Sequence, residues 1–75
     1  MSNIIYSKEH HHIIKRLKIA RIESGLTQEA SAKKLGRSQS FISKLESGQR
    51  KIDIITLKRL ARLYKKNITF FLGGK

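Results

Sequence analysis

The chain has 75 residues, which is enough for one small domain and disfavours a deep catalytic cleft, because so short a chain buries little more than half of its surface. It contains no cysteine, so the core must form from the 39% of residues that are hydrophobic, without disulfides or thiolate metal sites. Its 17 Lys and Arg residues against five Asp and Glu residues give a formal net charge of +12. This excess indicates a polyanionic partner, with nucleic acid ahead of an anionic membrane surface.

Three glycines divide most of the chain into short segments with helical periodicity. Gly25, Gly36 and Gly48 each follow such a segment, where a helix often ends in a residue with positive φ. The first helix is predicted from about residue 9 to residue 24, and the residues on its inner face are Ile13, Leu17, Ala20 and Arg21.

Small polar residues mark the starts of the following helices. Thr27 is a good N-cap for a second helix over 28–35, and Ser38 for a third over 39–46. Asp53 caps a fourth helix with these apolar residues at helical spacing: Ile55, Leu57, Leu60, Ala61 and Tyr64. Asn67 and Thr69 offer turn and capping chemistry before an apolar segment, 70–72. No segment has the alternation of a strand, so the sequence predicts an all-α fold.

The second and third predicted helices have the features of two helices that cross closely around a short turn. Ala32 is small where the helices meet, and Gly36 tolerates the positive φ that the turn favours. Ile42 and Leu45 lie at the phase that packs the third helix on the second. This is the helix-turn-helix arrangement, in which the later helix enters the major groove of DNA.

The stretch TQEASAKKLGRSQSFISKLESGQR resembles the Cro and phage-repressor (XRE) family of helix-turn-helix domains. The residues that match the family pattern are Gln28, Ala32, Gly36, Ile42, Ser43, Glu46 and Gly48. The resemblance covers about residues 11–72 and implies a compact five-helix, lambda-repressor-like domain. We therefore expect a flexible N-terminal arm at 1–9, the domain at 10–72 and a C-terminal tail at 73–75.

Two residues depart from the family pattern. Ser31 stands where the family usually has leucine, which removes apolar packing beneath the second helix. Arg37 stands where a small apolar residue is common, and it adds a charge beside the DNA-binding face.

The resemblance also implies roles for individual residues. The expected base-contacting residues are Gln39, Ser40, Ser43 and Lys44, whose side chains can hydrogen-bond base edges. The expected phosphate-contacting residues are Gln28, Arg37, Ser38, Arg50 and Lys51. The alternative for each is an ordinary solvated polar side chain. We expect that alternative for the basic cluster of the fourth helix, which comprises Lys58, Arg59, Arg62, Lys65 and Lys66.

Other side chains are expected to serve structure. The family joins the positions of Arg21 and Glu46 in an ion pair between the first and third helices, and Phe41 is expected to pack rather than stack on a base. Residues 70–72 can close the core or form part of a dimer interface, and we weigh these roles equally. Three consecutive histidines, 10–12, fan out around a helix, so we expect no metal site.

Several function classes compete for this sequence. An enzyme is the weakest, because no nucleophile, base and orienting group can be assembled, and we expect no cofactor. A membrane-surface peptide would fold only on lipid. No apolar run approaches a signal peptide or the roughly 20 residues of a membrane span, so we expect a cytoplasmic, nucleoid-associated protein without a membrane partner.

The resemblance implies a regulator of transcription, expected to be a repressor. We expect it to bind a double-stranded DNA operator through the third helix, as a homodimer at least on DNA. Antitoxins and controllers of restriction-modification operons resemble the same family. A protein partner, such as a toxin or another regulator, is therefore an open alternative.

Overall fold

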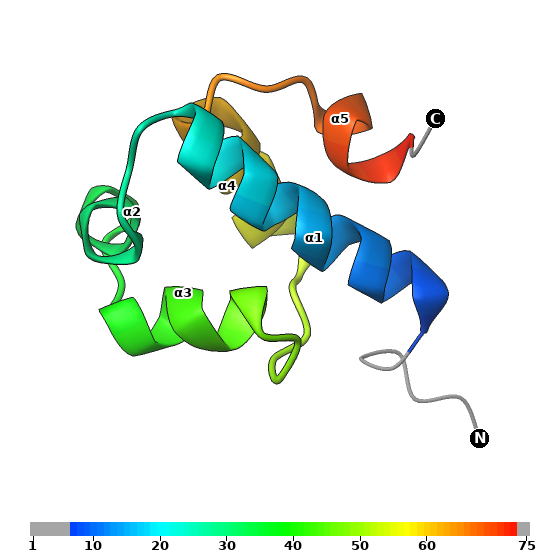
Figure 1. Ribbon diagram of the computed structural model, residues 1–75, viewed down its shortest axis with the longest axis horizontal. Helices are drawn as coiled ribbons and strands as arrows, with labels where there is room; N and C mark the ends of the chain where they lie inside the picture. Colours follow the sequence, from blue (N-terminus) through cyan, green and yellow to red (C-terminus); the bar gives the residue numbers. More distant parts are fainter. Residues whose placement is uncertain (1–6, 74–75) are drawn as a thin grey trace.

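The computed structural model describes residues 7–73, which form helices and connecting turns without a strand, as the sequence predicts. The helices are α1 (Lys8–Glu23), α2 (Gln28–Leu35), α3 (Gln39–Glu46), α4 (Ile54–Leu63) and α5 (Ile68–Leu72). In Figure 1, α1 crosses the front of the molecule with α4 behind it, while α3 lies below α1 and α5 above it. The all-α, five-helix architecture expected from the sequence is thus confirmed.

Each helix starts after a side chain that accepts a hydrogen bond from a backbone N–H of the first turn. Thr27, Ser38 and Asp53 cap α2, α3 and α4, as predicted. The pKa of the Asp53 carboxyl is lowered, chiefly because it accepts a hydrogen bond from the backbone N–H of Thr56. Asn67 caps the short helix α5 in the same way.

The first helix begins one residue earlier than expected. The Ser7 hydroxyl oxygen accepts a hydrogen bond of 3.0 Å from the backbone N–H of His10, so Lys8 and Glu9 lie in the first turn of α1 and not in an arm. Residues 1–6 of the expected arm lie outside the described residues, as do residues 74 and 75 of the expected tail. Gly73, the first residue of that tail, is the C-cap of α5.

The ends of α1 to α4 share one backbone geometry, in which two N–H groups beyond the helix bond back to carbonyls of its last turn. After α2, the N–H of Arg37 donates to the Ala32 carbonyl at 2.9 Å, and Gly36 has a φ of 82°. Gly25 and Gly48 take the same place after α1 and α3. After α4 this place is held by Lys65, with a φ of 57°, a site that no glycine marks in the sequence.

One face of each helix contributes residues to the core. The buried apolar residues are Ile14, Leu17, Ala20, Ala32, Leu35, Phe41, Ile42, Leu45, Leu57, Leu60, Ala61, Tyr64 and Phe71. Phe71 is fully buried while Leu72 is 52% exposed, so the apolar segment 70–72 closes the core through its central residue.

Two apolar residues that we expected to face the core are not fully buried. Ile14 belongs to the buried core, whereas Ile13, which we expected on the inner face of α1, is only partly buried. Ile55 is 61% exposed because, at 3.6 residues per turn, it lies on the side of α4 opposite to Leu57 and Leu60.

Ser31, which stands where the family usually has leucine, has a hydrogen-bond partner that the sequence did not reveal. The hydroxyl of Tyr64 donates a hydrogen bond of 2.9 Å to the Ser31 hydroxyl oxygen, and both residues are buried. Burial raises the pKa of Tyr64. A polar contact between α2 and the end of α4 therefore takes the place of the apolar packing that leucine would supply.

Candidate nucleic-acid interface

The third helix has two faces of opposite chemistry. Phe41, Ile42 and Leu45 are buried in the domain. The opposite face carries the expected base-contacting residues, all of them exposed: Gln39, Ser40, Ser43 and Lys44. No hydrogen bond joins any of these four side chains to another part of the chain that the structure describes. The helix therefore presents a row of uncommitted amide, hydroxyl and ammonium groups, which suit the donor and acceptor pattern of the major groove.

The orientation of this row is set where α2 meets α3. Ala32 is 2% exposed at the crossing, and Ile42 and Leu45 are each 1% exposed. The small side chain of Ala32 lets the two helices approach, while the positive φ of Gly36 turns the chain between them. Helices this short depend on tertiary packing for their stability, so the packing of α3 on α2 also fixes its direction.

A partly buried polar network holds the other end of α3. The Arg21 guanidinium donates to both carboxylate oxygens of Glu46, at 2.7 Å from Nε and 3.1 Å from Nη2. Its Nη1 donates to the Leu26 carbonyl at 2.8 Å. The pKa of Arg21 is raised, chiefly by its hydrogen bond to Glu46. The ion pair expected between α1 and α3 is thus present, and it also ties down the turn before α2.

Gln28, expected to bind a phosphate, belongs to the same network. Its side-chain Nε2 donates a hydrogen bond of 3.0 Å to Oε1 of Glu46. An amide nitrogen carries two hydrogens, so one donor remains for another acceptor. Gln28 is only partly buried, and the contact with Glu46 fixes its side chain at the start of α2.

Cationic and polar residues lie on both sides of α3. Arg37 and Ser38 precede the helix, while Arg50 and Lys51 follow it, and all four are exposed. The Ser38 hydroxyl oxygen accepts from the Phe41 backbone N–H at 3.2 Å, which leaves its own O–H as a donor. No acidic residue lies in the first turn of α3, whereas α1 and α2 carry Glu9 and Glu29 there. The start of α3 is therefore positive through both its side chains and its helix dipole.

Phe41 has a role that sequence reasoning did not find. It is 8% exposed, as expected for a packing residue, but its ring also lies under two arginines. The guanidinium carbon of Arg37 is 4.0 Å from the ring centroid, and that of Arg50 is 4.7 Å away. Arg50 is nine positions along the chain from Phe41, so no local pattern in the sequence reports this contact.

The basic residues in α4 and just after it are differently placed. Lys58, Arg59, Arg62 and Lys65 are exposed. Arg59 makes a long hydrogen bond of 3.4 Å to the Leu35 carbonyl. Lys66 is partly buried and forms an ion pair of 2.6 Å with Glu23. The solvated face predicted for α4 therefore holds for its four exposed members, and Lys66 is the exception.

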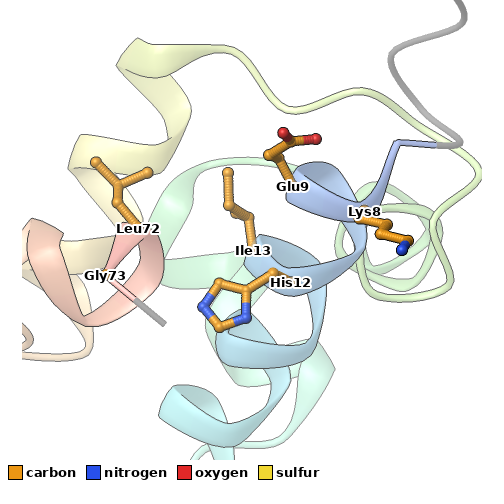
Figure 2. A pocket seen from close by; sticks show the side chains of 6 residues that line it. All are labelled: Lys8, Glu9, His12, Ile13, Leu72 and Gly73. Carbon is orange, nitrogen blue, oxygen red and sulfur yellow. The ribbon is translucent and has the colours of Figure 1, made fainter. Parts of the chain in front are cut away.

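The three histidines point in different directions, as consecutive helical residues must. His10 is buried, His11 is exposed and His12 is partly buried. A hollow of about 420 Å³ lies between the start of α1 and the end of α5. His12 and Leu72 are among the side chains that line it (Figure 2). Within the described residues, no group of three His, Cys, Asp or Glu side chains could share a metal ion.

Of the helices in residues 7–73, none is both long enough and apolar enough to cross a membrane.

Comparison with known proteins bears on the same elements. A helix-turn-helix family model matches residues 17–71, which run from within α1 to within α5. Over 59 residues the chain is 39% identical to the HTH-type transcriptional regulator ImmR of Bacillus subtilis (strain 168). The aligned region covers 79% of this chain and 46% of that relative, so the chain spans less than half of the relative's length. The chain belongs to the Cro and phage-repressor (XRE) family of helix-turn-helix DNA-binding domains.

Proposed function

We propose that the protein is a sequence-specific double-stranded DNA-binding regulator of transcription, acting as a repressor, with α3 lying in the major groove. The observation that carries the proposal is the exposed polar row of α3, whose members are Gln39, Ser40, Ser43 and Lys44. The opposite face of the helix is anchored in the core, and its end is anchored by the Arg21–Glu46 pair. A rigid helix with uncommitted hydrogen-bonding groups is what direct reading of base edges requires.

The charge distribution supports the same function. Arg37 and Ser38 precede α3 in the chain and Arg50 and Lys51 follow it, and these four exposed residues suit contacts with phosphates beside a groove. Gln28 is proposed to add a phosphate contact at the start of α2. The net charge of +12 favours association with DNA of any sequence, so that the polar row need supply only discrimination. The relative from Bacillus subtilis is named a transcriptional regulator, which supports a regulatory role.

Dimerisation on DNA forms part of the proposal. A single recognition helix reads few base pairs, whereas two half-sites about 34 Å apart, read by a symmetric pair of domains, multiply the specificity. The operator would then be a palindrome. The proposal places the protein on the DNA of the nucleoid, in the cytoplasm, and assigns no catalytic step to the chain.

Selection from a random duplex library tests the proposal directly. The selected duplex is titrated against a scrambled duplex at two salt concentrations. We expect a palindromic winner that binds about a thousandfold more tightly than the scrambled duplex. Binding without sequence preference, with steep salt dependence alone, would contradict the proposal and show that net charge dominates or that a protein partner is missing.

Two substitutions separate base reading from phosphate binding. Lys44→Ala should lose about 1–3 kcal/mol on the selected duplex and relax the preference at one base position. Arg50→Ala should weaken binding to every duplex alike and lower the salt slope by about one. Lys58→Ala, which removes an exposed lysine of α4, is the matched control and should change neither quantity. Equal weakening of every sequence by both Lys44→Ala and Arg50→Ala would show that these roles are wrongly assigned.

A further inference from the structure

Two arginines from opposite ends of α3 converge on one aromatic ring. Arg37 precedes the N-cap of the helix, and Arg50 follows its end by four residues. Their guanidinium carbons lie 4.0 and 4.7 Å from the centroid of the Phe41 ring. The guanidinium of Arg50 therefore lies beside Phe41, in the first turn of α3, rather than beyond the end of the helix.

The ring leaves the binding groups of both arginines free. A guanidinium that stacks on an aromatic ring uses its flat face, while its N–H donors point outward in its plane. No hydrogen bond or ion pair joins either side chain to another residue within 7–73. Both side chains are exposed, so two sets of guanidinium donors face solvent beside the same ring.

A second phenylalanine also contacts two cations, but there a carboxylate neutralises one of them. Phe70 also carries two cations, with Arg16 at 4.8 Å and Lys66 at 4.7 Å from its ring centroid. There, Lys66 is neutralised by Glu23 at 2.6 Å. At Phe41 no acidic residue among those that the structure describes pairs with either arginine, so the mutual repulsion of the two cations is left for an external anion to relieve.

We propose that Phe41 is a positioning residue whose ring holds Arg37 and Arg50 together as a clamp for DNA backbone phosphates beside the start of α3. The inference rests on the proposed function and adds how the phosphate contacts are organised. Arginine binds phosphate through paired N–H donors in fixed geometry, so a stacked guanidinium loses less side-chain freedom on binding than a mobile one. Replacement of Phe41 should therefore weaken DNA binding through the arginines alone.

The first test needs no DNA. In proton–nitrogen spectra, the Nε–H signals of Arg37 and Arg50 should be displaced by the ring current of Phe41, relative to the signal of exposed Arg62. Phe41→Leu should abolish the displacement, and Phe41→Tyr should keep it. Ordinary signals for both arginines in the wild-type chain would overturn the proposal whether or not the variants fold.

The second test measures binding to one fixed duplex, at a temperature where circular dichroism shows each variant to be folded. We expect Phe41→Leu to weaken binding about fivefold in the wild-type background. In the Arg37→Ala/Arg50→Ala background, the same substitution should have almost no effect, because its targets are gone. Phe41→Tyr should bind like the wild type. Phe70→Leu, which removes the other two-cation contact, is the matched control and should leave affinity unchanged.

The outcomes separate the two proposals. An equal loss from Phe41→Leu in both backgrounds, or no loss in either, would overturn the clamp and leave DNA binding intact. Failure of the wild-type chain to bind any duplex would overturn the proposed function and the clamp with it, even if the ring-current displacement were present.

Discussion

The two ends of α1 bury polar side chains in opposite ways. Near its C-terminal end, Arg21 donates three hydrogen bonds, two to Glu46 and one to the Leu26 carbonyl. Near its N-terminal end, His10 is only 4% exposed, yet neither ring nitrogen has a hydrogen-bond partner among the described residues. One end is a satisfied network and the other is an unsatisfied buried group.

The end of α1 with the satisfied hydrogen bonds is the end that contacts α3. The paired end of α1 lies where α1, α2 and α3 meet, so its hydrogen bonds hold the helix that carries the polar row. The unpaired end lies against the loop between α3 and α4, beside Ile52 and Asp53. A fully satisfied buried network rigidifies its surroundings, whereas an unsatisfied group costs stability without fixing a geometry. The satisfied hydrogen-bond network therefore lies directly behind the candidate interface, where it holds α3.

The largest expected effect breaks the satisfied end. Glu46→Ala leaves the Arg21 guanidinium, whose side chain is 11% exposed, with the Leu26 carbonyl as its remaining partner. We expect a loss of about 3 kcal/mol in the free energy of unfolding, measured by urea denaturation. Glu29→Ala removes an exposed glutamate from the first turn of α2 and should cost only a few tenths of a kcal/mol. Similar losses from the two substitutions would show that the network contributes little.

Next comes the buried hydroxyl pair between Ser31 and Tyr64. Tyr64→Phe removes the donor and leaves the buried Ser31 hydroxyl without it, which should cost about 1–2 kcal/mol. Adding Ser31→Ala removes the orphaned group, so the double variant should regain part of the loss. A double variant with the summed loss of both single variants would show that the two hydroxyls are not coupled.

The same residue predicts a pH dependence. Because burial raises the pKa of Tyr64 above its value in the unfolded chain, the unfolded state releases this proton first as pH rises. The contribution to stability is present below the ordinary tyrosine pKa and is lost as pH rises through the folded-state value. Denaturation at increasing alkaline pH should therefore show a smaller loss for Tyr64→Phe than for the wild type.

A smaller effect of opposite sign is expected at the unsatisfied end. His10→Leu replaces two buried nitrogens that lack partners by an apolar side chain of similar size. We expect a gain of about 1 kcal/mol in the free energy of unfolding. His11→Leu makes the same chemical change at an exposed neighbour and should stay within about 0.5 kcal/mol of the wild type. A loss of stability at His10 would mean that its ring nitrogens are satisfied in solution.

The smallest effect concerns Lys65, which lies just past α4, where the Tyr64 carbonyl accepts from the Ser24 hydroxyl at the end of α1. Its φ of 57° is unfavourable for a residue with a side chain, whereas glycine has no such penalty. Lys65→Gly should raise the free energy of unfolding by about 0.5 kcal/mol. Lys65→Ala loses the same charge but keeps the strain, so it should bring no gain. If both substitutions changed the free energy of unfolding equally, the change would come from the lost charge and not from backbone strain.

Much of the fold could be predicted because its signals are local. The caps Thr27, Ser38 and Asp53 each act within three residues of themselves, and Gly36 responds only to its own backbone conformation. The same locality covers the exposed row of α3, since the periodicity of one helix separates its polar and apolar faces. The ion pair of Arg21 and Glu46 was expected from family resemblance alone, because no local pattern joins residues so far apart.

The sequence by itself determined the first four helices and the polar face of the third, since caps, turns and periodicity act over a few residues, while the fifth helix was expected from family resemblance. Only the tertiary structure decided which side chains meet between helices and loops. It buried His10, paired Ser31 with Tyr64 and brought Arg50 over Phe41. These outcomes depend on the angles and distances at which helices and loops pack, and those arise from the whole core at once and not from any one segment.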